Sequence, residues 1–161
     1  METDRRHAYT VRTTWTGDRG SGTSGYRAYG REHLLEVAGK PPIAGSSDPA
    51  FRGDPALWTP EDMFVAALSS CHMLWYLHLC ADAGIVVRGY TDDAHGEMVE
   101  NAADGGRFVR IELRPRVALA AGADGARALA LHEEAHRRCF IANSVCCELA
   151  VQPMLEPYQG A

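Results

Sequence analysis

The order of strand-like and helix-like segments predicts an α+β fold for a single domain spanning residues 1–161. Short β-rich segments come first, a long apolar helix follows, and then come further strands, a second helix and a last strand. Strands grouped in this way favour α+β architecture over the regular strand–helix alternation of a parallel α/β fold. The 161 residues, 46% hydrophobic and 23% charged, are enough to bury one globular core.

The first third of the chain is predicted to hold short strands and one long loop. Residues 7–16 alternate between apolar and polar types and are rich in β-forming residues, which is typical of a strand. After a turn at 17–22, two short strands are expected at 25–29 and 33–37. Residues 39–59 are rich in Gly, Pro, Ser and Asp, so we expect a long loop of the functional or interface kind.

A strong helix signal begins at Pro60 and ends at Gly84. Thr59 is a suitable N-cap, Pro60 is tolerated at the first helical position, and acidic residues follow in the first turn. Apolar residues then cover most of the helical circumference. We therefore expect a central helix that is buried on nearly all sides, with a second subunit contributing to its burial.

The second half of the chain is predicted to continue with strands and one more main helix. The expected elements are strands at 86–90, 94–100 and 108–119, a helix at 126–138 with Asp124 as N-cap, a short helix or turn at 141–145 and a last strand at 148–155.

Charge and hydropathy exclude several classes of partner. The net charge of −5 and the lack of a basic run argue against nucleic acid. Residues 1–6 are polar, so we expect a flexible N-terminus and no signal peptide. No stretch reaches the roughly 18–20 apolar residues that cross a bilayer. These observations predict a cytoplasmic protein without a membrane partner.

Five cysteines, an odd number, do not suggest the disulfide framework of a small secreted domain. Cys71 is central in the first predicted helix, and Cys139 lies at the end of the second, so only the fold can bring them together. If they meet, a peroxidatic and a resolving thiol is the natural interpretation. Cys80, Cys146 and Cys147 are assigned to inert core positions, because free cysteine is often buried.

A peroxidatic cysteine must be a thiolate, which apolar surroundings alone oppose. A nearby cation is therefore required. Arginine suits this role because it stays charged when desolvated and can be held by a carboxylate. Glu61 precedes Cys71 by ten positions, close to three helical turns, so it points roughly the same way and is a candidate for that carboxylate.

Two other chemistries remain open at this point. His132, His136 and Cys139 share one helical face and could ligate zinc, but no CxxC pair or further ligand set completes a site. A cysteine hydrolase would need a base beside its nucleophile, and His72 points about 100° round the helix from Cys71. We predict neither a metal nor another cofactor.

Two segments give the sequence a family resemblance. They are "TPEDMFVAALSSCHMLWYLHLCADAGI" (59–85) and "AHRRCFIANSV" (135–145), and they resemble the two cysteine sites of the OsmC/Ohr family, which comprises osmotically inducible protein C and the organic hydroperoxide resistance proteins. The earlier "WTGDRGSGT" and "GSSDPAFRGD" resemble an OsmC-like subgroup. The resemblance extends from about Tyr9 to Pro153.

The resemblance implies an OsmC-like fold with two long central helices, wrapped by antiparallel β-sheets in an intertwined homodimer. It implies a thiol-dependent organic hydroperoxide reductase acting in the oxidative stress response. By motif position, Cys71 is the peroxidatic cysteine, Cys139 the resolving one with which it forms a disulfide, and Glu61 the carboxylate. Arg52 is the first choice for the activating arginine and Arg19 the second. A dithiol, such as a lipoylated protein, would be the reductant.

Apolar residues around the two cysteines fit an organic substrate. The candidates for an apolar pocket are Phe64, Leu74, Trp75, Met63 and Phe140, although plain core packing is the preferred explanation for most of them. Phe140 departs from the family, which often has proline after the second cysteine. The alternative function is a non-catalytic protein that binds a small molecule or a metal and whose cysteines are structural.

Overall fold

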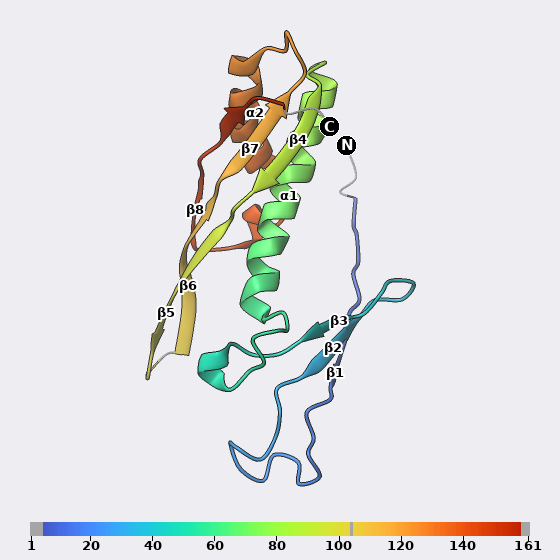
Figure 1. The fold of residues 1–161 in the computed structure, drawn as a ribbon, viewed down its shortest axis with the longest axis vertical. Coiled ribbons are helices and arrows are strands. Elements are labelled where there is room, and N and C mark those ends of the chain that lie inside the picture. Colours follow the sequence, from blue (N-terminus) through green and yellow to red (C-terminus); the bar gives the residue numbers. More distant parts are fainter. Residues whose placement is uncertain (1–4, 104, 159–161) are drawn as a thin grey trace. The chain divides into compact units, whose positions relative to one another are not determined.

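The computed structural model describes residues 5–103 and 105–158 and divides the chain into two compact units, between Met63 and Phe64. Within these described residues, both units contain β-sheet, and there are two α-helices (Figure 1). This mixture confirms the predicted α+β class. Residues 1–4 of the predicted flexible N-terminus lie outside the described residues.

The first unit contains a three-stranded antiparallel sheet in the order β1-β2-β3. Its elements are β1 (Arg12–Trp15), β2 (His33–Glu36), β3 (Ile43–Gly45) and the short 3-10 helix η1 (Pro49–Phe51). The indole N–H of Trp15 donates a hydrogen bond of 2.9 Å to the Gly30 carbonyl and so holds the β1–β2 connection against its own sheet. The predicted strands at 7–16 and 33–37 are thus confirmed in shortened form.

Two predictions for this unit are wrong. Residues 25–29 form turns instead of a strand, because the Arg31 guanidinium donates to the carbonyls of Tyr29 at 2.6 Å and Tyr26 at 2.8 Å. Such local bonds from a side chain to the backbone compete with strand pairing. The predicted loop at 39–59 contains β3 and η1.

Helix α1 (Pro60–Asp82) begins and ends where the sequence predicts. The Thr59 hydroxyl accepts the Asp62 N–H at 3.1 Å, and the Asp62 carboxylate accepts the Thr59 N–H at 3.0 Å, which is a reciprocal cap. Gly84 follows the helix with φ of 69°, a left-handed conformation that glycine adopts without strain.

One stripe of α1 is buried. Its members recur at helical spacing and are Leu68, His72, Tyr76, Leu79 and Cys80. Leu74, on another side, keeps 62% of its surface exposed. The single chain therefore leaves much of this apolar helix uncovered, and burial on nearly all sides would need a partner.

The length and hydropathy of α1 correct one sequence-based expectation. Among the described residues it is the one helix that is long and apolar enough to cross a membrane, with 23 residues and a mean hydropathy of 1.4 in its most apolar window. The core helix of a soluble protein meets the same criterion, so composition alone is weak evidence for membrane insertion.

The second unit contains two three-stranded sheets and α2. Its elements are β4 (Val87–Asp92), β5 (His95–Asn101), β6 (Gly105–Leu113), β7 (Pro115–Leu119), α2 (Gly125–Arg138), η2 (Ala142–Ser144), β8 (Glu148–Val151) and β9 (Met154–Glu156). One sheet has the order β4-β7-β9 and the other β5-β6-β8. The last two strands pair in parallel, β8 with β6 and β9 with β7, which corrects the expectation of purely antiparallel sheets.

Two predicted strands are each divided between these sheets. The strand expected at 108–119 breaks at Arg114, whose backbone N–H donates to the Asp92 carboxylate at 2.7 Å and not to a neighbouring strand. The strand expected at 148–155 breaks before Met154, because Pro153 has no N–H to donate. Helix α2 begins as predicted, with the Asp124 carboxylate accepting the Arg127 N–H at 2.9 Å.

Helix α1 contributes to two core clusters in the second unit. Its C-terminal half, around Tyr76 and Leu79, packs with Leu131 of α2 and Val117 of β7. Nearer its N-terminus, Leu68 packs with the β6 strand. Figure 1 shows α1 running alongside the strands of this unit, with α2 close to its C-terminal half. This arrangement brings the two cysteine-bearing segments together.

Candidate functional site

The thiols of Cys71 and Cys139 meet in the second unit. Cys71 lies in the middle of α1, and Cys139 is the residue that directly follows α2. The two side chains are near neighbours, because Cys71 is one of the groups that raise the pKa of Cys139. Both are free cysteines in this structure. The fold therefore brings Cys71 and Cys139 near each other, which the sequence alone could not test.

The end of α2 places the Cys139 thiol in the protein interior. Its side chain is 0% exposed, and the Ala142 N–H donates to its sulfur at 3.4 Å. The turn through η2 produces this contact, since the Asn143 N–H binds the Cys139 carbonyl at 3.0 Å and directs the chain back. Burial, with a smaller contribution from Cys71, raises the pKa of Cys139 to about 11. Cys139 is therefore a protonated thiol at neutral pH.

Cys71 differs from Cys139 in exposure. It is partly exposed, and it lies beside the buried stripe of α1 that contains Leu68 and His72. One side of Cys71 thus faces Cys139, while another is accessible. Of the two cysteines, Cys71 is therefore the more accessible residue.

The three charged candidates belong to the first unit, and the structure brings none of them together. Arg52 is exposed and caps η1 with φ of 70°. Arg19 lies 3.8 Å from Glu32 and is also exposed. Glu61 is in the first turn of α1. Within the described part of this unit, Glu61 forms no ion pair with either arginine, so their roles toward Cys71 stay predictions.

A buried pair of histidines was not predicted. His72 Nε2 lies 3.0 Å from His132 Nδ1, and the two rings stack with centroids 5.3 Å apart. Both side chains are at most 2% exposed. Burial lowers the pKa of His72 to about 4, with help from His136, and burial and His72 lower that of His132 to about 3. Both imidazoles are therefore neutral at physiological pH.

The contact with His72 occupies His132, which is one of the three residues, with His136 and Cys139, that the sequence suggested as possible zinc ligands. His132 turns toward α1 and uses Nδ1 for His72. No group of three or more metal-ligating side chains is present in 5–103 and 105–158. The sequence carried only a partial signal for the pair. His72 adjoins Cys71, and His132 lies seven residues, or two helical turns, before Cys139, which places His132 and Cys139 on one helical face. The pairing of the two histidines itself depends on how α1 packs against α2.

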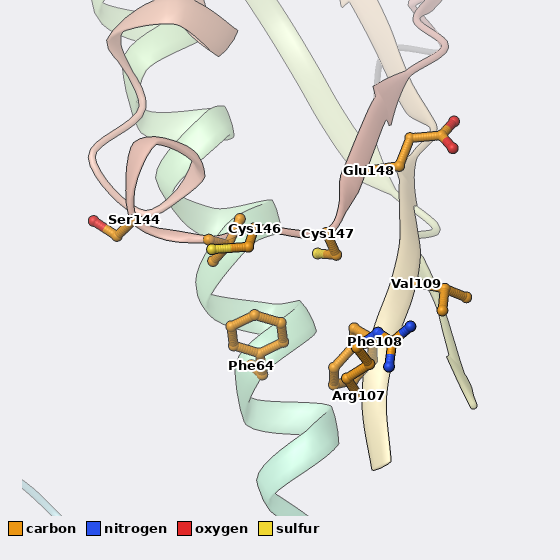
Figure 2. Close-up of a pocket in the computed structure, with 9 residues that line it drawn as sticks. Phe64, Arg107, Phe108, Val109, Ser144, Cys146, Cys147 and Glu148 are labelled. Carbon is orange, nitrogen blue, oxygen red and sulfur yellow. The ribbon is translucent and has the colours of Figure 1, made fainter. Parts of the chain in front are cut away.

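An apolar pocket of about 600 Å³ lies between the N-terminal part of α1, strand β6 and the segment that follows η2. Figure 2 shows the rings of Phe64 and Phe108 close together, below Cys146 and Cys147. The ring centroids are 4.9 Å apart, and Arg107 also lines the pocket. Cys146 is exposed and Cys147 is partly buried, so the predicted inert core position holds for Cys80 and is wrong for Cys146.

The apolar residues predicted to line a substrate pocket are distributed differently. Phe64 lines the pocket of Figure 2, whereas Leu74 is largely exposed on α1. Trp75 and Phe140 contact each other edge to face, with ring centroids 5.4 Å apart. In the sequence, Trp75 comes four residues after Cys71, and Phe140 directly follows Cys139.

A comparison with protein families finds one matching model. The model for OsmC-like protein matches residues 53–153, which include both thiols of the pair. None of the curated proteins matches the chain.

Solved structures with the same fold are numerous. An OsmC-like protein of unknown function from Vibrio cholerae is 32% identical, with a TM-score of 0.83, and the alignment covers 92% of this chain and 100% of that one. An organic hydroperoxide resistance protein from Elizabethkingia anophelis is 20% identical, with a TM-score of 0.65 over 98% of this chain and 100% of that one. One from Legionella pneumophila, described as a predicted redox protein, is 17% identical, with a TM-score of 0.67 over 94% and 99%. The last two similarities bear on the fold alone.

Proposed function

Because the chain belongs to the OsmC-like family, we propose that it is a peroxidase that reduces organic hydroperoxides with Cys71 and Cys139. The observation that carries the proposal is the proximity of these two thiols, one on α1 and one after α2. Two free cysteines that lie near each other can form a disulfide once their sulfur atoms come within bonding distance. That capacity is what a peroxidatic and resolving pair requires.

Differences in exposure and acidity support the roles proposed for the two thiols. The attacking group must be reachable by the peroxide and must be a thiolate. Cys139 is enclosed and its pKa is raised to about 11, so it is a poor first nucleophile. Cys71 is partly exposed, and we propose it as the peroxidatic cysteine.

The proposed reaction has three balanced steps. The Cys71 thiolate bonds to the outer peroxide oxygen, the O–O bond breaks, and the alkoxide takes a proton and leaves as the alcohol. The Cys139 thiol then attacks the sulfur of the Cys71 sulfenic acid, forming the disulfide and releasing water. A dithiol reductant exchanges with this disulfide, restores both thiols and is itself oxidised to a disulfide.

Activation of Cys71 is proposed to use an arginine that Glu61 holds in place. A guanidinium beside the sulfur would favour the thiolate, and a carboxylate would orient the guanidinium by paired hydrogen bonds. Arg52 is the first candidate, because it precedes α1 closely and forms no ion pair within the described part of its unit. Arg19 is the second candidate.

The assembly proposed is a homodimer in the cytoplasm. The support for the dimer is the uncovered apolar surface of α1, where Leu74 is 62% exposed. Burying such surface is favourable by roughly 25 cal/mol per Å², so a second copy packed on this helix would be stabilised. A reducing compartment would keep all five cysteines as thiols, as they are in this structure.

The pocket in Figure 2 favours one alternative, a protein that binds a small molecule and uses its cysteines structurally. Its volume of about 600 Å³ and its aromatic lining fall within the range of ligand sites. In that case neither Cys71 nor Cys139 would react with peroxide faster than an ordinary thiol.

A thiol count separates the two functions. Free thiols are measured by mass spectrometry before and after one equivalent of cumene hydroperoxide, in the wild type and in Cys146→Ser as the control for an exposed thiol. The peroxidase should lose two thiols and yield a peptide crosslinked through Cys71 and Cys139 in both proteins. Five unchanged thiols in the wild type would reject the peroxidase and favour ligand binding.

A further inference from the structure

Two adjacent cysteines outside the proposed reactive pair line the pocket of Figure 2. Cys146 and Cys147 lie between η2 and β8, and both are free. Cys147 packs against the core cluster around Leu68, whereas Cys146 is exposed. The reaction proposed above uses neither of them. Cys146 is therefore a free, exposed cysteine at the wall of a cavity, and it takes no part in that reaction.

The pocket offers an apolar surface to an organic molecule. Phe64 of α1 and Phe108 of β6 line it, with their ring centroids 4.9 Å apart and their planes inclined by 39°. Val109 and Val145 add aliphatic groups to the lining. The volume of about 600 Å³ is within the range of small-molecule sites. A molecule of that size can pack its carbon skeleton against the pocket wall while it reacts with Cys146.

One cation at the pocket has no ionic partner. Arg107 lines the pocket from β6, and Figure 2 shows it across the pocket from Cys146. In the parts of the chain that the structure describes, its guanidinium forms no ion pair. The Glu148 carboxylate also lines the pocket, but it lies 3.8 Å from the Arg110 guanidinium, which offsets its charge. The charge that remains favours an anionic ligand.

We propose that Cys146 is a modification site, which forms a mixed disulfide with a small organic thiol whose carboxylate is attracted by Arg107. The Cys146 thiol gives its proton to solvent, and the thiolate attacks one sulfur of the partner's disulfide. The S–S bond of the partner breaks, and its other half leaves as a thiolate that takes up a proton. The partner disulfide is thus the oxidant, and an excess of free thiol reverses the reaction. The site does not depend on the peroxidase function, because Cys71 and Cys139 take no part in it.

Two aromatic disulfides that differ in charge test the assignment. Dithiobis(nitrobenzoate) carries a carboxylate on each ring, whereas dithiodipyridine carries none. The full-length protein is mixed with either reagent, samples are quenched with acid at intervals, and peptide mapping by mass spectrometry gives the rate of adduct formation at Cys146. Arg107→Gln should slow the reaction with dithiobis(nitrobenzoate) about threefold, which is the size of effect that an exposed charge pair has. The rate with dithiodipyridine should stay unchanged.

Matched variants separate a local effect from a general one. Arg127→Gln removes the same charge from an exposed position on α2 that does not line the pocket, so both rates at Cys146 should stay at the wild-type value. Cys147→Ser should keep the adduct at Cys146, because Cys147 is the partly buried member of the two. A salt titration adds a second readout, since raising the ionic strength should slow only the charged reagent, and less so in Arg107→Gln.

Each result decides the assignment. A slower reaction of Arg107→Gln with the charged reagent alone, read at Cys146, would support it. An unchanged rate in Arg107→Gln, or an equal fall in Arg127→Gln, would overturn the anion preference and the proposal with it. The absence of an adduct at Cys146 in the wild type would reject the site outright. The peroxidase function is tested separately by peroxide consumption in Cys146→Ser, which should equal that of the wild type.

Discussion

Two pairs of side chains connect α1 with α2, and they differ in exposure. Cys71 meets Cys139, and His72, the next residue on α1, meets His132 at 3.0 Å. The imidazoles are enclosed on both sides, and burial lowers both pKa values far enough to keep them neutral. The thiol pair is enclosed only at Cys139. Of two neighbouring pairs with reactive side chains, the one with an accessible member is the one suited to chemistry.

The strongest test of this comparison removes the accessible member. Cys71→Ser should abolish peroxide consumption, because serine has no thiolate to attack the O–O bond. Consumption is followed with cumene hydroperoxide and dithiothreitol as substrates. His72→Gln is the neighbouring control and should keep most of the activity if it folds. Retained turnover in Cys71→Ser would reject the mechanism.

Removing the buried thiol of Cys139 should impair the second step of the reaction and not the first. Cys139→Ser should still oxidise once at Cys71 but then stall as a sulfenic acid or proceed to the sulfinic acid. Mass spectrometry after one equivalent and after an excess of peroxide distinguishes these products by their added oxygens. Normal turnover of this variant with dithiothreitol would refute the resolving role.

The histidine pair should be sensitive to acid. The pKa values of about 4 and about 3 lie below the 6.5 of a free imidazole, so the unfolded chain binds protons that the folded chain excludes. Stability is therefore complete above about pH 6.5 and should decline below it, by up to about 1.4 kcal/mol per pH unit for each histidine, until the folded state itself protonates near pH 4.

Urea unfolding between pH 4.5 and 7.5 measures this slope. His132→Leu should be less dependent on pH than the wild type, while the exposed His95→Gln should keep the wild-type slope. Equal slopes in all three proteins would show that the pair does not control acid stability.

The smallest effect is expected at Glu61. Glu61→Gln should slow oxidation of Cys71 a few-fold, because a neutral amide holds an arginine less firmly than a carboxylate does. Stopped-flow oxidation at several pH values measures this, with Asp62→Asn as the control for a charge in the same helical turn. Asp62 caps α1 through the Thr59 N–H, so its variant should lose stability and keep the rate. An unchanged rate in Glu61→Gln would remove Glu61 from the mechanism.

The sequence predicted the parts of the molecule that depend on local signals. The ends of α1 follow from Thr59 and Gly84, and the two cysteines could be singled out from their helical context. The histidine pair could not, because it depends on how α1 and α2 are set against each other. The missing strand at 25–29 has a similar cause, since the Arg31 side chain takes up carbonyls that a strand would need.

The parallel pairings at the end of the chain have a consequence for how the protein acquires its thiol pair. Strand β8 pairs with β6, and β9 with β7, only after the chain has passed through α2 and Cys139. Pairings between segments distant in sequence form slowly, because the loop between them must close first. We expect Cys71 to exist for a time without its partner in each newly made molecule. A peroxide encountered in that interval would oxidise a cysteine that has no neighbouring thiol to form a disulfide with, so the time needed to bring α2 against α1 would set how long Cys71 is exposed to over-oxidation.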